Sequence, residues 1–344
     1  MVLKLMKILV LGYFGYVTNQ LDGQTIKTRD VYALLKEKSQ DEVEYFDTQS
    51  FKVSKFNILK MLWMIIKAHH IFYLPAHNNL KYIFPLVYLL AKISNTKVNY
   101  LVIGGWLSEF LSNKKLHRYM LKGINGIYVE TDHLLNNLSK YNFKNLHKLY
   151  NFRMVDIEKI KPSKNIDKNI KLVFMARVHP MKGVDVLFDI DKSIKKIGIN
   201  NVSIDIYGQI LESYKDEFFK KIKASNINYR GAIEPCNIYD VLPSYDLMLF
   251  PTKYYTEGFP GTILDAYISG LPVVATNWLN AKEFILNEET GFIVEFDHHE
   301  LYIQTVLNLL ANSHKIDELK HNVVLRRKIY SLSSVWDTLQ KSMK

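Results

Sequence analysis

Two carboxylates flank the start of a predicted helix in the second half of the chain, at Glu257 and Asp265, with seven residues between them. Gly258 and Gly261 leave the backbone open there, so main-chain N–H groups can face a ligand. Pro260 suits the first turn of a helix, where a missing N–H costs little. A helix N-terminus favours an anion, and carboxylates accept hydrogen bonds from hydroxyl groups. The pattern therefore predicts a site for phosphate and polyol side by side, as in a nucleotide sugar.

Two cations follow a predicted strand at 171–175. Arg177 lies just after the strand, and Lys182 lies five residues further on, before Gly183 and a predicted helix. Cations at these places would bind a diphosphate and stabilise the charge that develops when its bond to a sugar breaks. Each charge-assisted contact is worth about 1.5–3 kcal/mol. Either cation alone is typical of a protein surface, and its pairing with the acid motif favours a functional role.

Apolar runs typical of strands alternate with helical patterns along the whole chain, which indicates parallel α/β sheets. The predicted strands are 7–11, 42–46, 71–74, 98–103 and 126–129, then 171–175, 202–207, 247–250, 273–275 and 291–294. The polar stretch 151–168 is predicted to be a linker, and 344 residues suit two domains. We predict an N-terminal domain over 1–155 and a C-terminal domain over 156–325, followed by a helical segment over 326–344.

Residues 256–276 resemble the donor-site signature of retaining glycosyltransferases of family 4, which have the GT-B fold. The family pattern is a glutamate, seven residues and a second glutamate, so Asp265 is one methylene shorter than that pattern. Arg177 and Lys182 match two cations of the family. The resemblance implies that Glu257 holds hydroxyls of the donor sugar, Asp265 the ribose, and the two cations the diphosphate. It also implies two Rossmann-like domains that face each other across a cleft, with the last helix crossing back to the first domain.

The resemblance further implies which residues surround these groups. The predicted donor-binding residues are Gly258, Phe259, Pro260, Gly261, Thr262, Asp265, Tyr207, Gly208, Ala232 and Ile233. The predicted acceptor or phosphate loop of the first domain contains Gly15, Gly23, Gln24, Lys27 and Arg29. Many relatives place a histidine or aspartate after the middle strand of that domain, whereas Gly104 and Gly105 stand there in this chain. We assign no general base, because in this family a donor phosphate oxygen is thought to accept the acceptor's proton.

A net charge of +11 and a pI near 9.3 require an explanation. Nucleic acid, an anionic membrane and phosphorylated substrates are the candidate partners, and no motif of a nucleic-acid-binding fold supports the first. Residues 51–66 and 83–93 mix apolar and aromatic residues, with lysines among them or beside them, and neither run reaches the ~20 residues of a spanning helix. They suit either a membrane interface or the core of the first domain. The resemblance to enzymes with lipid-linked acceptors favours peripheral contact with the inner membrane leaflet.

The sequence has no Asp-x-Asp motif in a suitable loop and no His or Cys cluster with metal-ligand spacing, so we predict neither a metal nor a cofactor. The single cysteine, Cys236, fits a reducing compartment, and we predict a cytoplasmic protein. We predict a retaining, metal-independent glycosyltransferase that moves a sugar from a nucleoside diphosphate, with UDP favoured, to a glycan or polyprenyl-linked acceptor. The sequence that follows the first strand of the first domain resembles that of bacterial surface-polysaccharide transferases. A noncatalytic GT-B subunit that binds a partner or lipid is the alternative.

Overall fold

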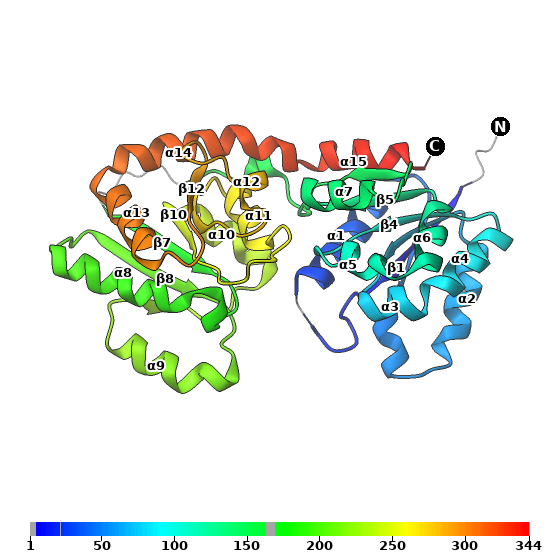
Figure 1. The fold of residues 1–344 in the computed structure, drawn as a ribbon, viewed down its shortest axis with the longest axis horizontal. Coiled ribbons are helices and arrows are strands. Elements are labelled where there is room, and N and C mark those ends of the chain that lie inside the picture. Colours follow the sequence, from blue (N-terminus) through cyan, green and yellow to red (C-terminus); the bar gives the residue numbers. More distant parts are fainter. Residues whose placement is uncertain (1–4, 21, 163–168, 344) are drawn as a thin grey trace. The chain divides into compact units, whose positions relative to one another are not determined.

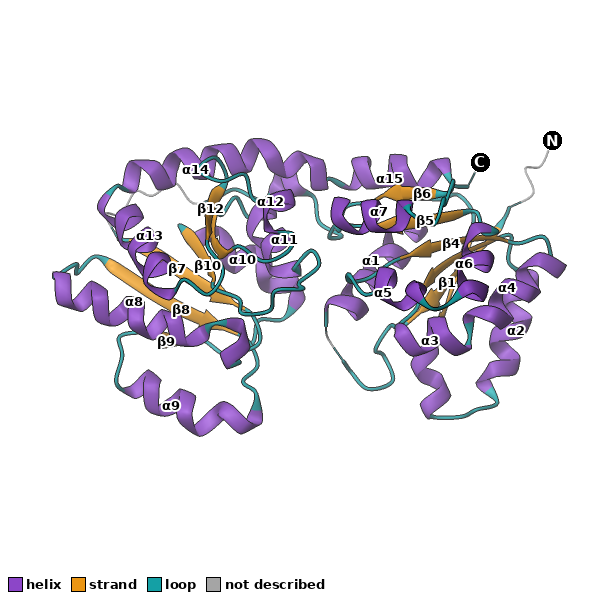
Figure 2. Cartoon of the chain, in the orientation of Figure 1, coloured by secondary structure: helices purple, strands orange, loops and turns teal. Residues whose placement is uncertain are grey.

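A computed structural model describes residues 5–20, 22–162 and 169–343, so part of the predicted linker, 163–168, lies outside the described residues. The chain divides into two compact units, one from Met1–Val155 and Tyr330–Lys344, the other from Asp156–Ile329. Each unit contains a six-stranded parallel sheet with helices packed on it (Figures 1 and 2). The predicted α/β class with two Rossmann-like sheets is confirmed.

The sheet of the first unit has the order β2-β1-β3-β4-β5-β6. Its strands are β1 (Lys7–Gly12), β2 (Glu42–Asp47), β3 (His70–Leu74), β4 (Lys97–Leu101), β5 (Gly126–Val129) and β6 (Leu146–Lys148). Alternate residues of β1 face opposite cores, with Ile8 and Val10 on one side and Leu9 and Leu11 on the other. Burial on both faces explains why these strands are nearly continuous apolar runs in the sequence.

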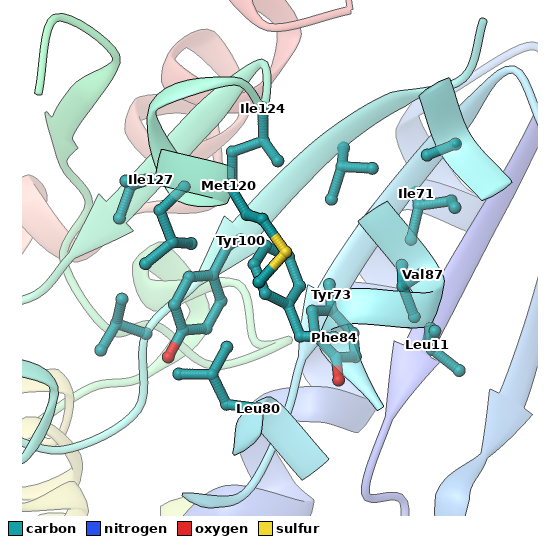
Figure 3. Packing of buried hydrophobic residues seen from close by; sticks show 14 of the residues in the cluster. Leu11, Ile71, Tyr73, Leu80, Phe84, Val87, Tyr100, Met120, Ile124 and Ile127 are labelled. Atoms are coloured by element: carbon teal, nitrogen blue, oxygen red, sulfur yellow. The ribbon is translucent and has the colours of Figure 1, made fainter. Parts of the chain in front are cut away.

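Helices cover both faces of this sheet. One face carries α1 (Gly23–Lys38) and α15 (Leu332–Lys341). The other carries α2 (Asn57–Lys67), α3 (His77–Tyr82), α4 (Phe84–Ile93), α5 (Leu107–Ser112), α6 (Lys115–Lys122) and α7 (Asp132–Ser139). Figure 3 shows the core between the sheet and this second group of helices, where Tyr73, Tyr100, Phe84 and Met120 gather. No helix among the described residues is both long enough and apolar enough to span a bilayer.

The sheet of the second unit has the order β12-β11-β10-β7-β8-β9. Its strands are β7 (Ile170–Met175), β8 (Val202–Tyr207), β9 (Asn228–Tyr229), β10 (Leu247–Phe250), β11 (Val273–Thr276) and β12 (Gly291–Val294). The strand order reverses at β7, with β8 on one side and β10 on the other. Ligands of such sheets bind outside the carboxyl ends of the strands at the reversal. The loops that follow β7 and β10 are therefore the place to look for a site.

The helices of the second unit include α8 (Val184–Ile197), α9 (Lys215–Lys223), α10 (Ile238–Val241), α11 (Gly261–Ile268), α12 (Ala281–Phe284), α13 (His299–Ala311) and α14 (Ser313–Arg326). Helix α11 begins one residue later than the sequence suggested, because Pro260 is extended and precedes the first helical residue. Gly270, with φ of +78°, follows the end of α11 as predicted. The helix is thus held between two fixed ends.

Candidate functional site

The loops after β7, β8 and β10 touch one another through their main chains. Gly183 has φ of +77°, and a Cβ there would lie 1.7 Å from the carbonyl oxygen of Pro251. Gly208 has φ of +143°, and a Cβ there would lie 1.8 Å from the carbonyl oxygen of Ala176. Only glycine fits either position. The two glycines therefore allow three loops to meet at the carboxyl edge of the sheet.

An ion pair joins two of the predicted site residues across these loops. The amine of Lys182 contacts the carboxylate of Glu257, and the two side chains are 23% and 17% exposed. Thr252 lies 3.4 Å from the same carboxylate oxygen, and the ring of Tyr254 lies 4.9 Å from the Lys182 amine. Asn280 donates a 2.6 Å hydrogen bond to the main-chain oxygen of Glu257. Without a ligand, the predicted sugar-binding acid and a predicted phosphate-binding cation therefore neutralise each other.

The second predicted cation and the start of α11 lie at the end of β7. The Thr262 hydroxyl donates a 2.7 Å hydrogen bond to the carbonyl oxygen of Met175, the last residue of β7. Arg177, two residues further on, is exposed, and within the described part of the chain no residue bonds its side chain. A free guanidinium beside a helix N-terminus is a suitable environment for an anion.

Asp265 lies within α11 and is 4% exposed. Its Oδ1 accepts a 2.8 Å hydrogen bond from the hydroxyl of Tyr239 on α10. The sequence analysis did not single out Tyr239, since nothing in the spacing of residues around α10 marks it. The contact fixes the orientation of the shorter acid in the motif.

Other predicted donor-binding residues serve the packing of these loops. Phe259 is buried and stacks on Phe284, with ring centroids 3.9 Å apart. The phenol of Tyr207 shares a 3.0 Å hydrogen bond with that of Tyr245. Burial, and hydrogen bonds to Tyr207 and Asp205, raise the pKa of Tyr245 above its ordinary value. These contacts pack the loops together, and the contact of Phe259 and Tyr207 with a donor stays a prediction.

The last two predicted donor-binding residues, Ala232 and Ile233, follow a second glycine turn at Gly231. The Gly208 N–H donates a 2.9 Å hydrogen bond to the carbonyl oxygen of Gly231, which has φ of +80°. Ala232 and Ile233 come directly after this turn, and Ala232 is exposed. Their main-chain groups are thereby carried close to Gly208, and their contact with a nucleobase stays a prediction.

The predicted loop of the first unit is described separately. Gly15 has φ of +73°, and a Cβ there would lie 2.5 Å from the carbonyl oxygen of Gln20. Gly23 is exposed at the start of α1, and the buried Nε2 of Gln24 has no hydrogen-bond partner among the described residues.

Lys27 is 2% exposed and pairs with Glu130, which follows β5 and is also buried. The sequence analysis did not single out Glu130. The charge of Lys27 is therefore neutralised inside the unit, and its contact with an acceptor phosphate stays a prediction.

Within the described ranges, no group of three or more His, Cys, Asp or Glu side chains is arranged to hold a metal ion. Cys236 is a free, exposed thiol.

Comparisons with known proteins match part of the second unit to a known family. Residues 169–312 match a family model described as "Glycosyl transferases group 1". The capsular polysaccharide biosynthesis glycosyltransferase CapM of Staphylococcus aureus is 25% identical over 184 residues, 52% of this chain and 46% of CapM. An uncharacterized 41.2 kDa protein of the cps region of Klebsiella pneumoniae is 26% identical over 146 residues, 41% of this chain and 38% of that protein. The chain thus aligns with less than half the length of these relatives.

Solved structures match the chain over a greater length. Anabaena HepE in complex with UDP-glucose superposes with a TM-score of 0.75 and 16% identity, covering 98% of this chain and 99% of HepE. The sucrose-phosphate synthase of Thermosynechococcus elongatus gives a TM-score of 0.73 and 11% identity, with 98% of both chains covered. At such identities the likeness is one of fold. The chain has the GT-B fold. The family match of residues 169–312 indicates a glycosyltransferase domain.

Proposed function

We propose that this protein is a retaining, metal-independent glycosyltransferase that uses a UDP-sugar. The observation that carries the proposal is the ion pair of Lys182 and Glu257 at the carboxyl edge of the second sheet, where Arg177 also follows the end of β7. The site combines cations for a diphosphate with acids for hydroxyl groups. The UDP complexes of HepE support the choice of nucleotide.

Donor binding would exchange one set of contacts for another. The diphosphate would contact Arg177, Lys182 and the main-chain N–H groups at the start of α11. Lys182 would leave Glu257, whose carboxylate would then accept hydrogen bonds from the donor sugar. Asp265, oriented by Tyr239, would accept a hydrogen bond from the ribose.

The reaction would follow from this placement. The bond between the anomeric carbon and the diphosphate oxygen breaks, and the acceptor oxygen bonds to that carbon on the same face. The acceptor's proton passes to a phosphate oxygen of the departing UDP, so no separate base is needed. Arg177 and Lys182 would stabilise the negative charge that develops on the diphosphate.

The acceptor would be a glycan or a polyprenyl-linked glycan of a bacterial surface polysaccharide, made at the cytoplasmic face of the membrane. The likeness to CapM supports this choice.

Release of UDP from UDP-sugars, with and without EDTA, tests the proposal. Wild-type protein should release UDP in EDTA, whereas Glu257→Ala and Arg177→Ala should lose turnover while they remain folded. Glu212→Ala is the control, because Glu212 belongs to an exposed pair with Lys215. Full activity of either site variant would refute the assignment. A wild-type protein that binds UDP without turnover would instead favour a noncatalytic subunit.

Peripheral contact with an anionic membrane is the second part of the proposal, and it rests on one surface of the first unit. Helix α4 packs against both α2 and α6. Large apolar or aromatic side chains that are 53–82% exposed occur on or beside α2, α3, α4 and α6: Phe56, Leu59, Trp63, Ile66, Tyr82, Leu89, Ile93, Leu116 and Tyr119. We name this set, together with Lys67 and Lys81 beside its aromatic rings, the basic apolar surface. Met61, Met64 and Ile65 of the same segment are buried, so the segment 51–66 serves the core and also exposes apolar residues.

Lysines stand beside the aromatic rings of this surface. The amine of Lys67 lies 4.5 Å from the ring centroid of Trp63, and that of Lys81 lies 4.7 Å from that of Tyr82. Apolar rings with cations around them suit the interface of an anionic bilayer, where each lysine adds about 1 kcal/mol.

Sedimentation with vesicles tests the contact. Wild-type protein should bind phosphatidylglycerol vesicles more than phosphatidylcholine vesicles, and 0.5 M salt should weaken the binding because it shortens the screening length to about 4 Å. The double variant Leu59→Ser and Trp63→Ser should lose it. The double variant Ile197→Ser and Leu325→Ser, which changes two exposed apolar residues of the second unit, should not. Equal binding of both double variants would refute this surface.

A further inference from the structure

A hollow of about 470 Å³ lies beside α1 in the first unit. The side chains that line it include Tyr16, Arg29, Asp30, Tyr32, Lys36 and Glu37. It is open to solvent rather than an enclosed cavity. Most of these residues repeat at helical spacing along one side of α1, so the helix itself builds one wall of the hollow.

The two acids of the hollow have cationic neighbours outside it. Asp30 lies 3.8 Å from a guanidinium nitrogen of Arg153, and Glu37 lies 2.8 Å from the amine of Lys38. Each of these contacts offsets a negative charge of the lining. Both acids of the lining therefore lie within 4 Å of a cation outside the hollow.

The two cations of the hollow have no such partner. Among the described residues, no carboxylate forms an ion pair with Arg29 or Lys36. The Nε of Arg29 donates a 2.7 Å hydrogen bond to the carbonyl oxygen of Phe14, and the guanidinium lies 4.4 Å from the ring centroid of Tyr16. Its Nη2 also donates a 3.5 Å hydrogen bond to the carbonyl oxygen of Gln20. These contacts hold the guanidinium in place and leave further N–H groups for a ligand, because arginine carries five donors.

Two tyrosines line the hollow, Tyr32 on α1 and Tyr16 in the loop after β1. Tyr16 and Tyr32 both pack against Tyr45, with ring centroids 5.7 Å and 5.1 Å apart. Tyr16 is also 49% exposed. A fixed, partly exposed ring offers an apolar face to the C–H groups of a sugar ring, while its hydroxyl keeps a polar contact.

We propose that this hollow is a subsite for an acidic sugar of the acceptor, meaning a pyranose that carries a carboxylate or a phosphate. Arg29 binds the anionic group, Lys36 adds a second positive charge, and the tyrosines flank the ring. The proposal rests on the proposed function, because it assigns the acceptor of that transferase. It extends the function by giving the acceptor a negative charge next to the sugar ring.

Calorimetric titration of the full chain with trigalacturonic acid, and with neutral galactotriose, tests the subsite. The acidic trimer should bind at least about tenfold more tightly than the neutral one, which corresponds to about 1.4 kcal/mol. Arg29→Gln and Lys36→Gln should each weaken the acidic trimer alone. Lys60→Gln is the matched control, since it removes an equal charge from an exposed position on α2, outside the hollow. Equal affinities for the two trimers, or equal losses in Lys36→Gln and Lys60→Gln, would overturn the subsite.

Competition then distinguishes the two kinds of anion. Displacement of the trimer by glucose 6-phosphate at lower concentration than by glucuronate supports a phosphorylated sugar, and the reverse order supports a uronic acid. Hydrolysis of UDP-sugar in the absence of acceptor is measured in parallel, because it depends on the second unit. Hydrolysis without binding of the acidic trimer overturns the subsite and leaves the proposed function standing. Absence of both hydrolysis and UDP binding counts against the function itself.

Discussion

Replacement of Glu257 by glutamine should make UDP bind more tightly while the enzyme loses turnover. In the unliganded site the Lys182 amine contacts the Glu257 carboxylate. A diphosphate must break this contact before it can use Lys182. Glu257→Gln keeps the shape of the side chain and removes its charge, so the lysine is easier to recruit. The donor sugar, in turn, loses an anionic hydrogen-bond acceptor.

The size of the effect follows from the difference between two kinds of hydrogen bond. A contact between charged groups contributes about 1.5–3 kcal/mol, and a neutral one about 0.5–1.5 kcal/mol. Both side chains are less than a quarter exposed, so solvent screens the pair only in part. The variant should hold Lys182 less strongly by roughly 1–1.5 kcal/mol, which makes the dissociation constant of UDP about five- to tenfold lower.

Calorimetric titration with UDP measures the affinity, and UDP release from UDP-sugar measures turnover. Glu212→Gln, in the exposed pair with Lys215, controls for the change in net charge. Lys182→Gln should weaken UDP binding and thereby show that the lysine contacts the nucleotide. An unchanged or weaker affinity in Glu257→Gln would show that the ion pair does not compete with the diphosphate, and the reasoning would be refuted.

Three further predictions concern stability and positioning. Gly183→Ala should unfold the second unit because its Cβ would overlap a main-chain oxygen, whereas Gly198→Ala, at a similar φ in open space, should cost only about 1–2 kcal/mol; equal melting temperatures would contradict this. Tyr239→Phe removes the hydroxyl bonded to Asp265 and should weaken UDP binding by up to about tenfold with no large loss of stability; an unchanged affinity in calorimetry counts against a positioning role. Burial lowers the pKa of His70 to about 4 in the folded chain, against 6.5 when the chain is unfolded. As the pH drops from 6.5 towards 4, His70 is protonated in the unfolded chain but not in the folded one, so the free energy of unfolding falls. Between pH 7 and pH 5, the free energy of unfolding measured with urea should fall by about 2 kcal/mol less in His70→Asn than in wild type.

The sequence predicted the strands that are buried on both faces, because such strands are apolar runs that stand out from their surroundings. It missed β6 and β9, which are edge strands of three and two residues. Both strands are at most partly buried and contain polar residues, and one hydrogen-bonding edge of each has no neighbouring strand. Their position is decided by pairing with β5 and β8, which no local pattern records.

The candidate site was predictable where a residue's role follows from its own motif. Glu257 and Asp265, like Arg177 and Lys182, lie within one short segment of the chain, so their spacing can be detected. The partners of Asp265 and Lys27 could not be predicted in this way, because Tyr239 is 26 residues from Asp265 and Glu130 is 103 residues from Lys27. Side chains brought together by folding over such separations leave no spacing to detect.

The close approach of three loops at Gly183 and Gly208 also bears on the entropy of binding. Loops whose main chains touch cannot easily move one at a time, so the region that carries Arg177, Lys182 and Glu257 is ordered before a nucleotide arrives. Binding then loses little conformational freedom, and more of each contact's free energy appears as affinity. The two glycines permit this contact and therefore contribute to the affinity of the site as well as to the stability of the unit.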